Sequence, residues 1–100
     1  MTDELALNRA AAKATRAQAL LADELLTESF KGLEEAYAAA WRSTTIDDVS
    51  GREKLFLAIN VVGKVRDHLT AIVANGKLAQ AELRQIAETA EREKRWQDVR

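Results

Sequence analysis

Apolar residues in the second half of the chain recur at alternating spacings of three and four. The row consists of Leu55, Ala58, Val62, Val65, Leu69 and Ile72. Such alternating steps place side chains on one face of an α-helix and form a heptad seam, along which a second long helix packs. Phe56, Ile59 and Val73 widen this seam. The pattern therefore predicts a helix over residues 51–74 that contacts more than one neighbour.

Local signals mark both ends of this helix. Ser50 stands three residues before Glu53, which is the spacing of a capping box. Asn75-Gly76 is a common left-handed terminator of helices. The spacing of three and four between apolar residues nevertheless continues to residue 90. We therefore expect a third helix over about residues 78–96, which follows either a tight turn or a kink at Asn75-Gly76.

The first half of the chain also has a helical pattern. Thr2, followed by the acids Asp3 and Glu4, is typical of a helix N-terminus. An apolar face follows at Leu26, Phe30, Leu33, Tyr37 and Trp41, with steps of three and four. The β-branched and acidic residues after them favour a loop. The sequence thus predicts helix one over about residues 3–42 and a loop over 43–50.

These elements predict an all-α fold in a single domain that spans residues 1–100. Helix one and helix two should pack as a long antiparallel helical hairpin, followed by the shorter third helix. The absence of proline and the presence of only four glycines favour a few long helices. Much of the apolar content is alanine, which buries little area, so we expect a thin core. Another copy or a partner would then cover the remaining apolar surface.

The residues expected at such an oligomer or partner interface belong to the seam of helix two and to two tryptophans. They are Leu55, Phe56, Ala58, Ile59, Val62, Val65, Leu69, Ile72, Trp41 and Trp96. Trp96 stands among polar neighbours, and an isolated tryptophan on a charged helix is typical of an interface anchor. Alternatively, Trp96 caps the hairpin of its own chain. Ala58 and Gly63 are small enough to let another backbone come close.

Candidate catalytic residues are scarce. The chain has no cysteine, and His68 is its single histidine. A zinc site on a helix would need further ligands four residues away, where Lys64 and Ile72 stand. The adjacent acids Glu34 and Glu35 do not share a helical face. No serine or threonine lies in a nucleophile motif, and no glycine-rich phosphate loop is present. We predict no catalytic residue, metal or cofactor, and a protein that is not an enzyme.

The charges are nearly balanced, with 15 Lys and Arg against 16 Asp and Glu. This balance excludes a strongly basic nucleic-acid-binding domain, so any phosphate contact must come from a local patch. Arg9, Lys13 and Arg16 form one basic stripe on helix one, which an oligomer would repeat. Arg52 and Lys54 form a second candidate anion site at the start of helix two. Solvated helix faces are the alternative interpretation of both groups.

The first residues of the sequence and the length of its apolar runs indicate where in the cell the protein is expected. The acidic start of the sequence differs from the basic start of a secretion signal. No apolar run approaches the roughly 20 residues that are needed to cross a membrane. We therefore expect a cytoplasmic protein that has no membrane partner.

Residues 24–83 resemble small helical proteins that are encoded by tailed phages, prophages and gene transfer agents. The resemblance rests on residues 25–30, on Ala40-Trp41-Arg42, on Gly51-Arg52-Glu53, on residues 63–66 and on residues 75–79. It implies a small-terminase-like role in DNA packaging and virion assembly. Such a protein is a homo-oligomer in the host cytoplasm that engages viral DNA and a packaging or head protein.

A second phage family is similar in outline, namely the small anti-CBASS sponges that sequester cyclic oligonucleotides. Gly51-Arg52-Glu53-Lys54 and Asn75-Gly76 match the start and the end of the second helix in that family. The interior over residues 60–68 departs from its pattern. This resemblance implies reversible binding of a cyclic nucleotide without turnover. A plain protein–protein interaction module remains a third alternative.

Overall fold

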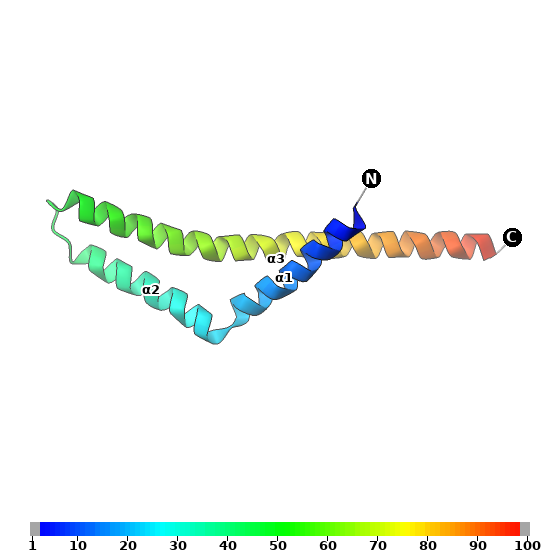
Figure 1. Ribbon diagram of the computed structural model, residues 1–100, viewed down its shortest axis with the longest axis horizontal. Helices are drawn as coiled ribbons and strands as arrows, with labels where there is room; N and C mark the ends of the chain where they lie inside the picture. The colour runs from blue at the N-terminus through cyan, green and yellow to red at the C-terminus, as the bar shows by residue number, and fades with distance from the viewer. Residues whose placement is uncertain (1–2, 99–100) are drawn as a thin grey trace. The chain divides into compact units, whose positions relative to one another are not determined.

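A computed structural model describes residues 3–98 of the chain. These residues form three α-helices, α1 (Glu4–Ala22), α2 (Glu24–Arg42) and α3 (Val49–Asp98) (Figure 1). No strand occurs between residues 3 and 98. The prediction of an all-α fold is therefore confirmed.

The prediction of one helix over residues 3–42 is wrong, because α1 and α2 separate at Asp23. The backbone of Asp23 is extended, with φ −67° and ψ 121°. Its carboxylate accepts a hydrogen bond from the Leu26 amide at 2.8 Å, and its carbonyl accepts one from the Thr27 hydroxyl at 2.9 Å. An aspartate in this position accepts a hydrogen bond from an amide of the first turn that has no partner within the helix. Its negative charge also interacts favourably with the positive end of the helix dipole. Asp23 therefore begins a new helix where the chain could have continued the old one.

The other two helices begin in the same way. The Asp3 carboxylate accepts a hydrogen bond from the Leu5 amide, and the Asp48 carboxylate accepts one from the Gly51 amide, both at 3.0 Å. The predicted capping box at Ser50 is therefore wrong, since α3 begins at Val49 with Asp48 as its cap. The predicted cap at Thr2 lies outside the described residues.

The prediction that Asn75-Gly76 ends a helix is also wrong. The single helix α3 replaces the predicted helices over 51–74 and 78–96. No glycine among the described residues has a positive φ, so Gly76 does not adopt the left-handed conformation of a terminator. Gly76 is instead a buried residue within α3.

We expect the Asp23→Ala substitution to lower the free energy of unfolding by about 1 kcal/mol, because it leaves the Leu26 amide without its capping carboxylate. Chemical unfolding followed by circular dichroism measures this loss. Asp67→Ala is the matched control, since Asp67 is an exposed aspartate in the middle of α3. An equal loss in both variants would contradict the capping role of Asp23.

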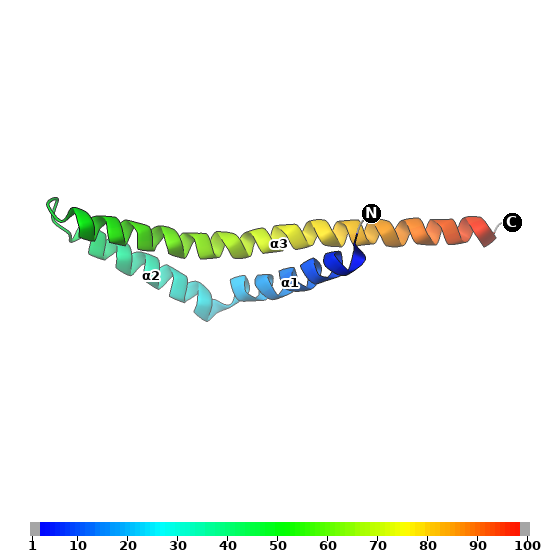
Figure 2. The ribbon, with the colours of Figure 1, turned by 45° about the horizontal axis from the view of Figure 1, so that its top comes forward.

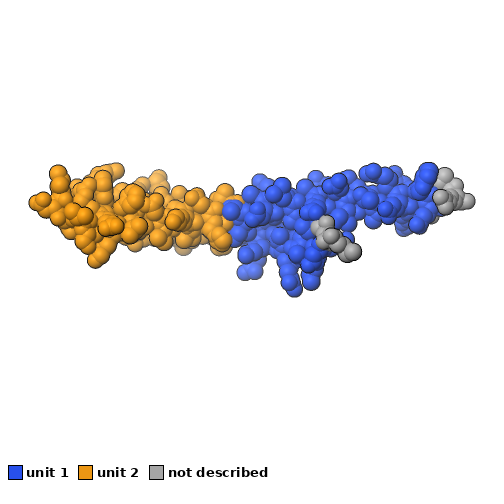
Figure 3. All heavy atoms as spheres, turned by 90° about the horizontal axis from the view of Figure 1, so that it is seen from above, with its two compact units in different colours: residues 1–17, 71–100 blue, residues 18–70 orange. Residues whose placement is uncertain are grey.

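The chain divides into two compact units (Figure 3). The boundary between them passes through α1 and through α3, so each of these helices belongs partly to both units. In unit 1, the described residues are 3–17 and 71–98, and α1 runs antiparallel to α3 (Figures 1 and 2). Its buried apolar residues are Ala14, Ala17 and Ala79, each 3–4% exposed. A Cβ atom at Gly76 would overlap the Cβ of Ala14 and lie 3.0 Å from the Ala10 carbonyl oxygen. Small residues thus let the two helices approach closely.

Unit 2 comprises residues 18–70, in which α2 and the first part of α3 form an antiparallel hairpin (Figure 1). The predicted hairpin is therefore confirmed, although its first arm is α2 alone. Half-buried side chains line the inner side of both helices. They are Leu26, Phe30 and Tyr37 of α2 and Leu55, Val62 and Leu69 of α3. The predicted heptad seam is consequently used within the chain.

Candidate interaction surfaces

The residues predicted for an oligomer interface fall into two groups in the structure. Leu55, Ala58, Ile59, Val62, Leu69 and Ile72 are half-buried in the monomer. Phe56, Val65 and Trp96 remain 58%, 46% and 69% exposed. The tenth predicted residue, Trp41, is 36% exposed and contacts Arg52 of its own chain. The inner seam therefore serves the fold of the chain itself, and only the second group is free to contact a partner.

A second apolar row on α3 was missed by the sequence analysis. Leu57, Val61 and Val65 follow one another at steps of four and are 54%, 59% and 46% exposed. Steps of four keep side chains on nearly the same side of a helix, so the three residues form a continuous stripe beside the seam. The signal was present in the sequence, but it was merged with the stronger repeat of the seam.

The hairpin of unit 2 is held in register by contacts between α2 and α3. The Arg66 guanidinium pairs with the Glu34 carboxylate at 2.8 Å and lies 5.5 Å from the centre of the Phe30 ring. At the turn, the Arg52 guanidinium stacks on the Trp41 ring at 4.4 Å. These contacts set Phe30 and Glu34 of α2 against Arg66 of α3, and Trp41 against Arg52.

Leu33 extends the exposed row of α3 onto α2. It is 44% exposed and belongs to a side of α2 that also carries the exposed residues Ala36 and Ala40. In both helices, the residues of this side are rotated about a quarter turn around the helix axis from the residues that face the other helix, and the sense of the rotation is the same. Two antiparallel helices with such an offset present these sides to the same face of the hairpin. We call this surface the outer face; it consists of Leu33, Ala36, Ala40, Leu57, Val61 and Val65.

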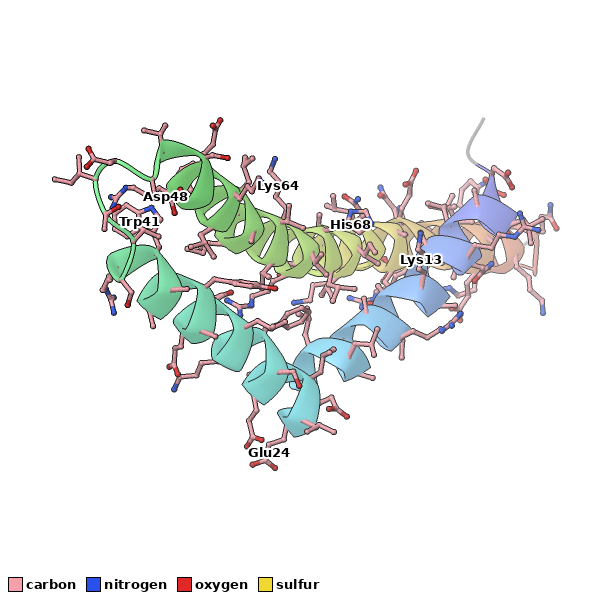
Figure 4. All side chains as sticks on the ribbon, turned by 60° about the vertical axis from the view of Figure 1, so that its left-hand side comes forward. Lys13, Glu24, Trp41, Asp48, Lys64 and His68 are labelled. Atoms are coloured by element: carbon pink, nitrogen blue, oxygen red, sulfur yellow. The ribbon has the colours of Figure 1, made fainter. Side chains whose placement is uncertain are left out.

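The predicted anion site at the start of α3 is partly engaged within the chain. Arg52 stacks on Trp41 and donates a hydrogen bond from Nη1 to the Thr44 hydroxyl at 3.0 Å. Figure 4 shows Trp41 and Asp48 at this end of unit 2. Lys54 is exposed and stays a candidate anion ligand. The clearest role of Arg52 is to join the end of α2 to the start of α3.

The predicted basic stripe lies on α1. Arg9, Lys13 and Arg16 are all exposed, and within residues 3–98 no ion pair joins them to a carboxylate (Figure 4 labels Lys13). The chain contains no acid between residues 5 and 22. No acid within this stretch of α1 therefore neutralises their charges, which favours contacts with phosphates.

The remaining candidate residues are His68 and Trp96, both on α3. His68 is exposed on α3, and no group of three potential metal ligands occurs among residues 3–98 (Figure 4). Trp96 is exposed and lines an open hollow together with Thr89, Arg92 and Arg95. None of the described helices is long and apolar enough to span a membrane.

Comparisons of the chain with models of protein families, with curated proteins and with solved structures give no match.

Proposed function

We propose that the chain is a non-enzymatic adaptor that works as a homo-oligomer of helical hairpins, in a phage-type role like that of a small terminase. The observation that carries this proposal is the contrast between its core and its surface. The buried apolar residues among those described are three alanines, while Leu57 and Val61 are more than half exposed. The resemblance of residues 24–83 to small phage proteins supports the same role.

The exposed area supports permanent association. The chain exposes 8114 Å². A folded monomer of its mass, 11.1 kDa, exposes about 5,700 Å². Two chains that each buried this surplus of about 2,400 Å² would bury about 4,800 Å² together, which lies in the range of about 2,000–5,000 Å² that permanent complexes bury in total. Partners that cover this surplus would remove the cost of exposed apolar surface.

Light scattering of the purified chain tests the oligomeric part of the proposal. We expect a mass that is an integral multiple of 11.1 kDa at micromolar concentration. A mass of one chain under these conditions would contradict a homo-oligomeric adaptor. The test needs no knowledge of the DNA or protein partner.

The basic stripe supports the DNA-binding part of the proposal. Arg9, Lys13 and Arg16 lie at i, i+4 and i+7 on α1, so a duplex could contact all three. An oligomer repeats the stripe in each copy, and contacts that are weak singly then add up. Binding of this kind follows the phosphate backbone and is independent of base sequence.

We expect the chain to bind duplex DNA with an affinity that falls steeply as salt rises. Replacing Arg9, Lys13 and Arg16 by alanine should weaken binding and reduce the slope of log K against log salt by about 3 per bound copy. Fluorescence anisotropy of labelled duplexes measures both effects. The matched control replaces three exposed cations of α3, namely Lys77, Arg84 and Arg92. An unchanged slope in the α1 variant would exclude the stripe as the DNA site, and no binding at low salt would leave a protein–protein role alone.

A further inference from the structure

We propose that two copies of this chain exchange their first helices, so that α1 of each copy packs on α3 of the other. The contact is the one that joins α1 to α3 in unit 1 (Figures 1 and 2). In the exchanged dimer, α1 and α2 form one continuous helix over residues 4–42. This inference rests on the proposed oligomeric function and names the contact through which the copies assemble.

The joint between α1 and α2 is a single residue, Asp23, since α1 ends at Ala22 and α2 begins at Glu24. The φ of Asp23, −67°, already has the helical value, and only its ψ of 121° departs from the value of about −42° in a helix. A change of this one angle gives up the cap on the Leu26 amide. It also gives the other free amides at the start of α2 partners within a continuous helix. Hinges as short as this favour exchange between copies.

A continuous helix would turn the apolar rows of α1 and α2 to opposite sides. Ala14 and Ala17 are buried in unit 1. Leu26 and Phe30 are half-buried on the inner side of the hairpin in unit 2. At about 100° per residue, a helix turns by about half a circle between Ala17 and Leu26. With α2 on its own α3, α1 of a continuous helix would point its buried alanines away from that α3. The α3 of a second copy then supplies the surface that they fit.

The surface of α3 that α1 covers is shaped for this helix. A Cβ atom at Gly76 would overlap the Cβ of Ala14 and lie 3.0 Å from the Ala10 carbonyl oxygen, so the contact needs a residue without a side chain. The contact is the same whether α1 comes from its own chain or from the other copy. Exchange therefore preserves the packing of unit 1, which makes it a low-cost route to a dimer. It also leaves the basic stripe of α1 exposed for DNA.

The exposed side chain of Leu25 is a second observation in favour of the continuous helix. Leu25 stands four residues after Leu21 and continues the row of α1, yet it is 73% exposed. The contact of Ala14 with Gly76 sets the register of α1 on α3. Leu25 and Val65 lie equally far from this contact along antiparallel helices, so exchange brings them to one level. Val65 is 46% exposed in the single chain. The exchanged dimer would thus cover two apolar side chains that one chain leaves in water.

The Asp23→Ala substitution tests the hinge. It removes the cap of α2 and places the best helix former at the joint, so each copy should favour the continuous helix about tenfold more. Because two joints straighten in one dimer, we expect analytical ultracentrifugation to show a dissociation constant about a hundredfold lower. Asp67→Ala is the matched control, since it removes an exposed aspartate from the middle of α3 and leaves the joint unchanged. At concentrations where the chain is monomeric, Asp23→Ala only destabilises the fold.

Complementary variants show whether the contact of α1 with α3 lies within one chain or between two. Gly76→Ala adds a methyl group that overlaps the Cβ of Ala14, and Ala14→Gly removes that Cβ atom. In an exchanged dimer with one chain of each variant, the enlarged α3 meets the reduced α1, and the second contact is unchanged. After the two variants are refolded together, native mass spectrometry should find about four fifths or more of the dimers to be mixed, because each dimer of Gly76→Ala alone is overpacked twice. Random pairing gives one half.

The outcomes separate this inference from the proposed function. If the chain associates but mixed dimers are no more frequent than random pairing gives, α1 stays on its own chain. Exchange is then refuted, while the oligomeric function stands. A dissociation constant that Asp23→Ala leaves unchanged, or that Asp67→Ala lowers equally, would also overturn the exchange at this hinge. A chain that is monomeric in every variant would remove the proposed oligomeric function itself.

Discussion

Replacing Gly76 by alanine is expected to lower the free energy of unfolding by about 2 kcal/mol. Alanine in place of glycine normally stabilises a helix by about 1 kcal/mol, because the unfolded chain has less freedom to lose. At Gly76 the new methyl group would overlap the Cβ of Ala14 and lie 3.3 Å from its Cα. Neither atom can move without displacing α1, and overpacking of this kind costs up to about 3 kcal/mol. The steric cost therefore exceeds the gain in helix propensity.

The Gly63→Ala substitution provides the matched control. Gly63 lies in the same helix, and a Cβ atom there would meet nothing within 4 Å. We expect this variant to raise the free energy of unfolding by about 1 kcal/mol, which corresponds to a rise in Tm of about 4–8 °C. Both variants are compared by thermal and chemical unfolding at one protein concentration, since association would also stabilise the fold. A stabilising effect of Gly76→Ala would contradict the close approach of α1 and α3.

That α3 is one continuous helix was predictable from the spacing of its apolar residues, but the dipeptide Asn75-Gly76 indicated a helix end. Gly76 continues the alternating steps from Leu69 and Ile72 to Ala79, so it occupies a seam position that faces a neighbouring helix. The pair Asn75-Gly76 is equally typical of a helix end, and a single sequence cannot decide between the two. The deciding factor is tertiary, since a small residue is needed where α1 packs. The predicted end of a helix is uncertain where one residue fits both a helix terminator and a packed position within the helix.

The break at Asp23 had a signal that the apolar pattern concealed. Asp23, Glu24 and Leu25 repeat the tripeptide with which α1 begins at Asp3. The surrounding alanines and leucines continue the helical phase across the break, so the spacing of apolar residues gave no warning. Aspartate is unfavourable within a helix and favourable at its first cap, and this preference decided the outcome.

The sequence predicted that apolar surface would stay exposed, but it only partly predicted which residues form that surface. The sequence indicated apolar surface beyond what one hairpin can bury, and the exposed Val65 and Phe56 agree with that expectation. It could not separate the inner seam from the outer face, because the two differ only in which side α2 covers. The stack of Arg52 on Trp41 was also missed, since it joins residues across the turn.

Replacing Trp41 by alanine is expected to lower the free energy of unfolding by about 2 kcal/mol. Trp41 is 36% exposed, so about two thirds of a large apolar side chain is removed from water on folding. The stack with Arg52 adds about 0.5–1 kcal/mol, as is usual for a partly exposed cation and an indole ring. The loss combines both effects, and chemical unfolding followed by circular dichroism measures it.

Trp96→Ala is the matched control for this prediction, because Trp96 is 69% exposed and should lose less than about 0.5 kcal/mol. A double-mutant cycle with Arg52→Ala isolates the stack itself. We expect a coupling energy of about 0.5–1 kcal/mol between the two residues. The single variant Arg52→Ala should also remove the hydrogen bond from Arg52 to the Thr44 hydroxyl, while that hydroxyl keeps its own bond to the Trp41 carbonyl. A coupling energy of zero, or equal losses for both tryptophans, would mean that the Trp41–Arg52 contact does not hold α2 and α3 together at the turn.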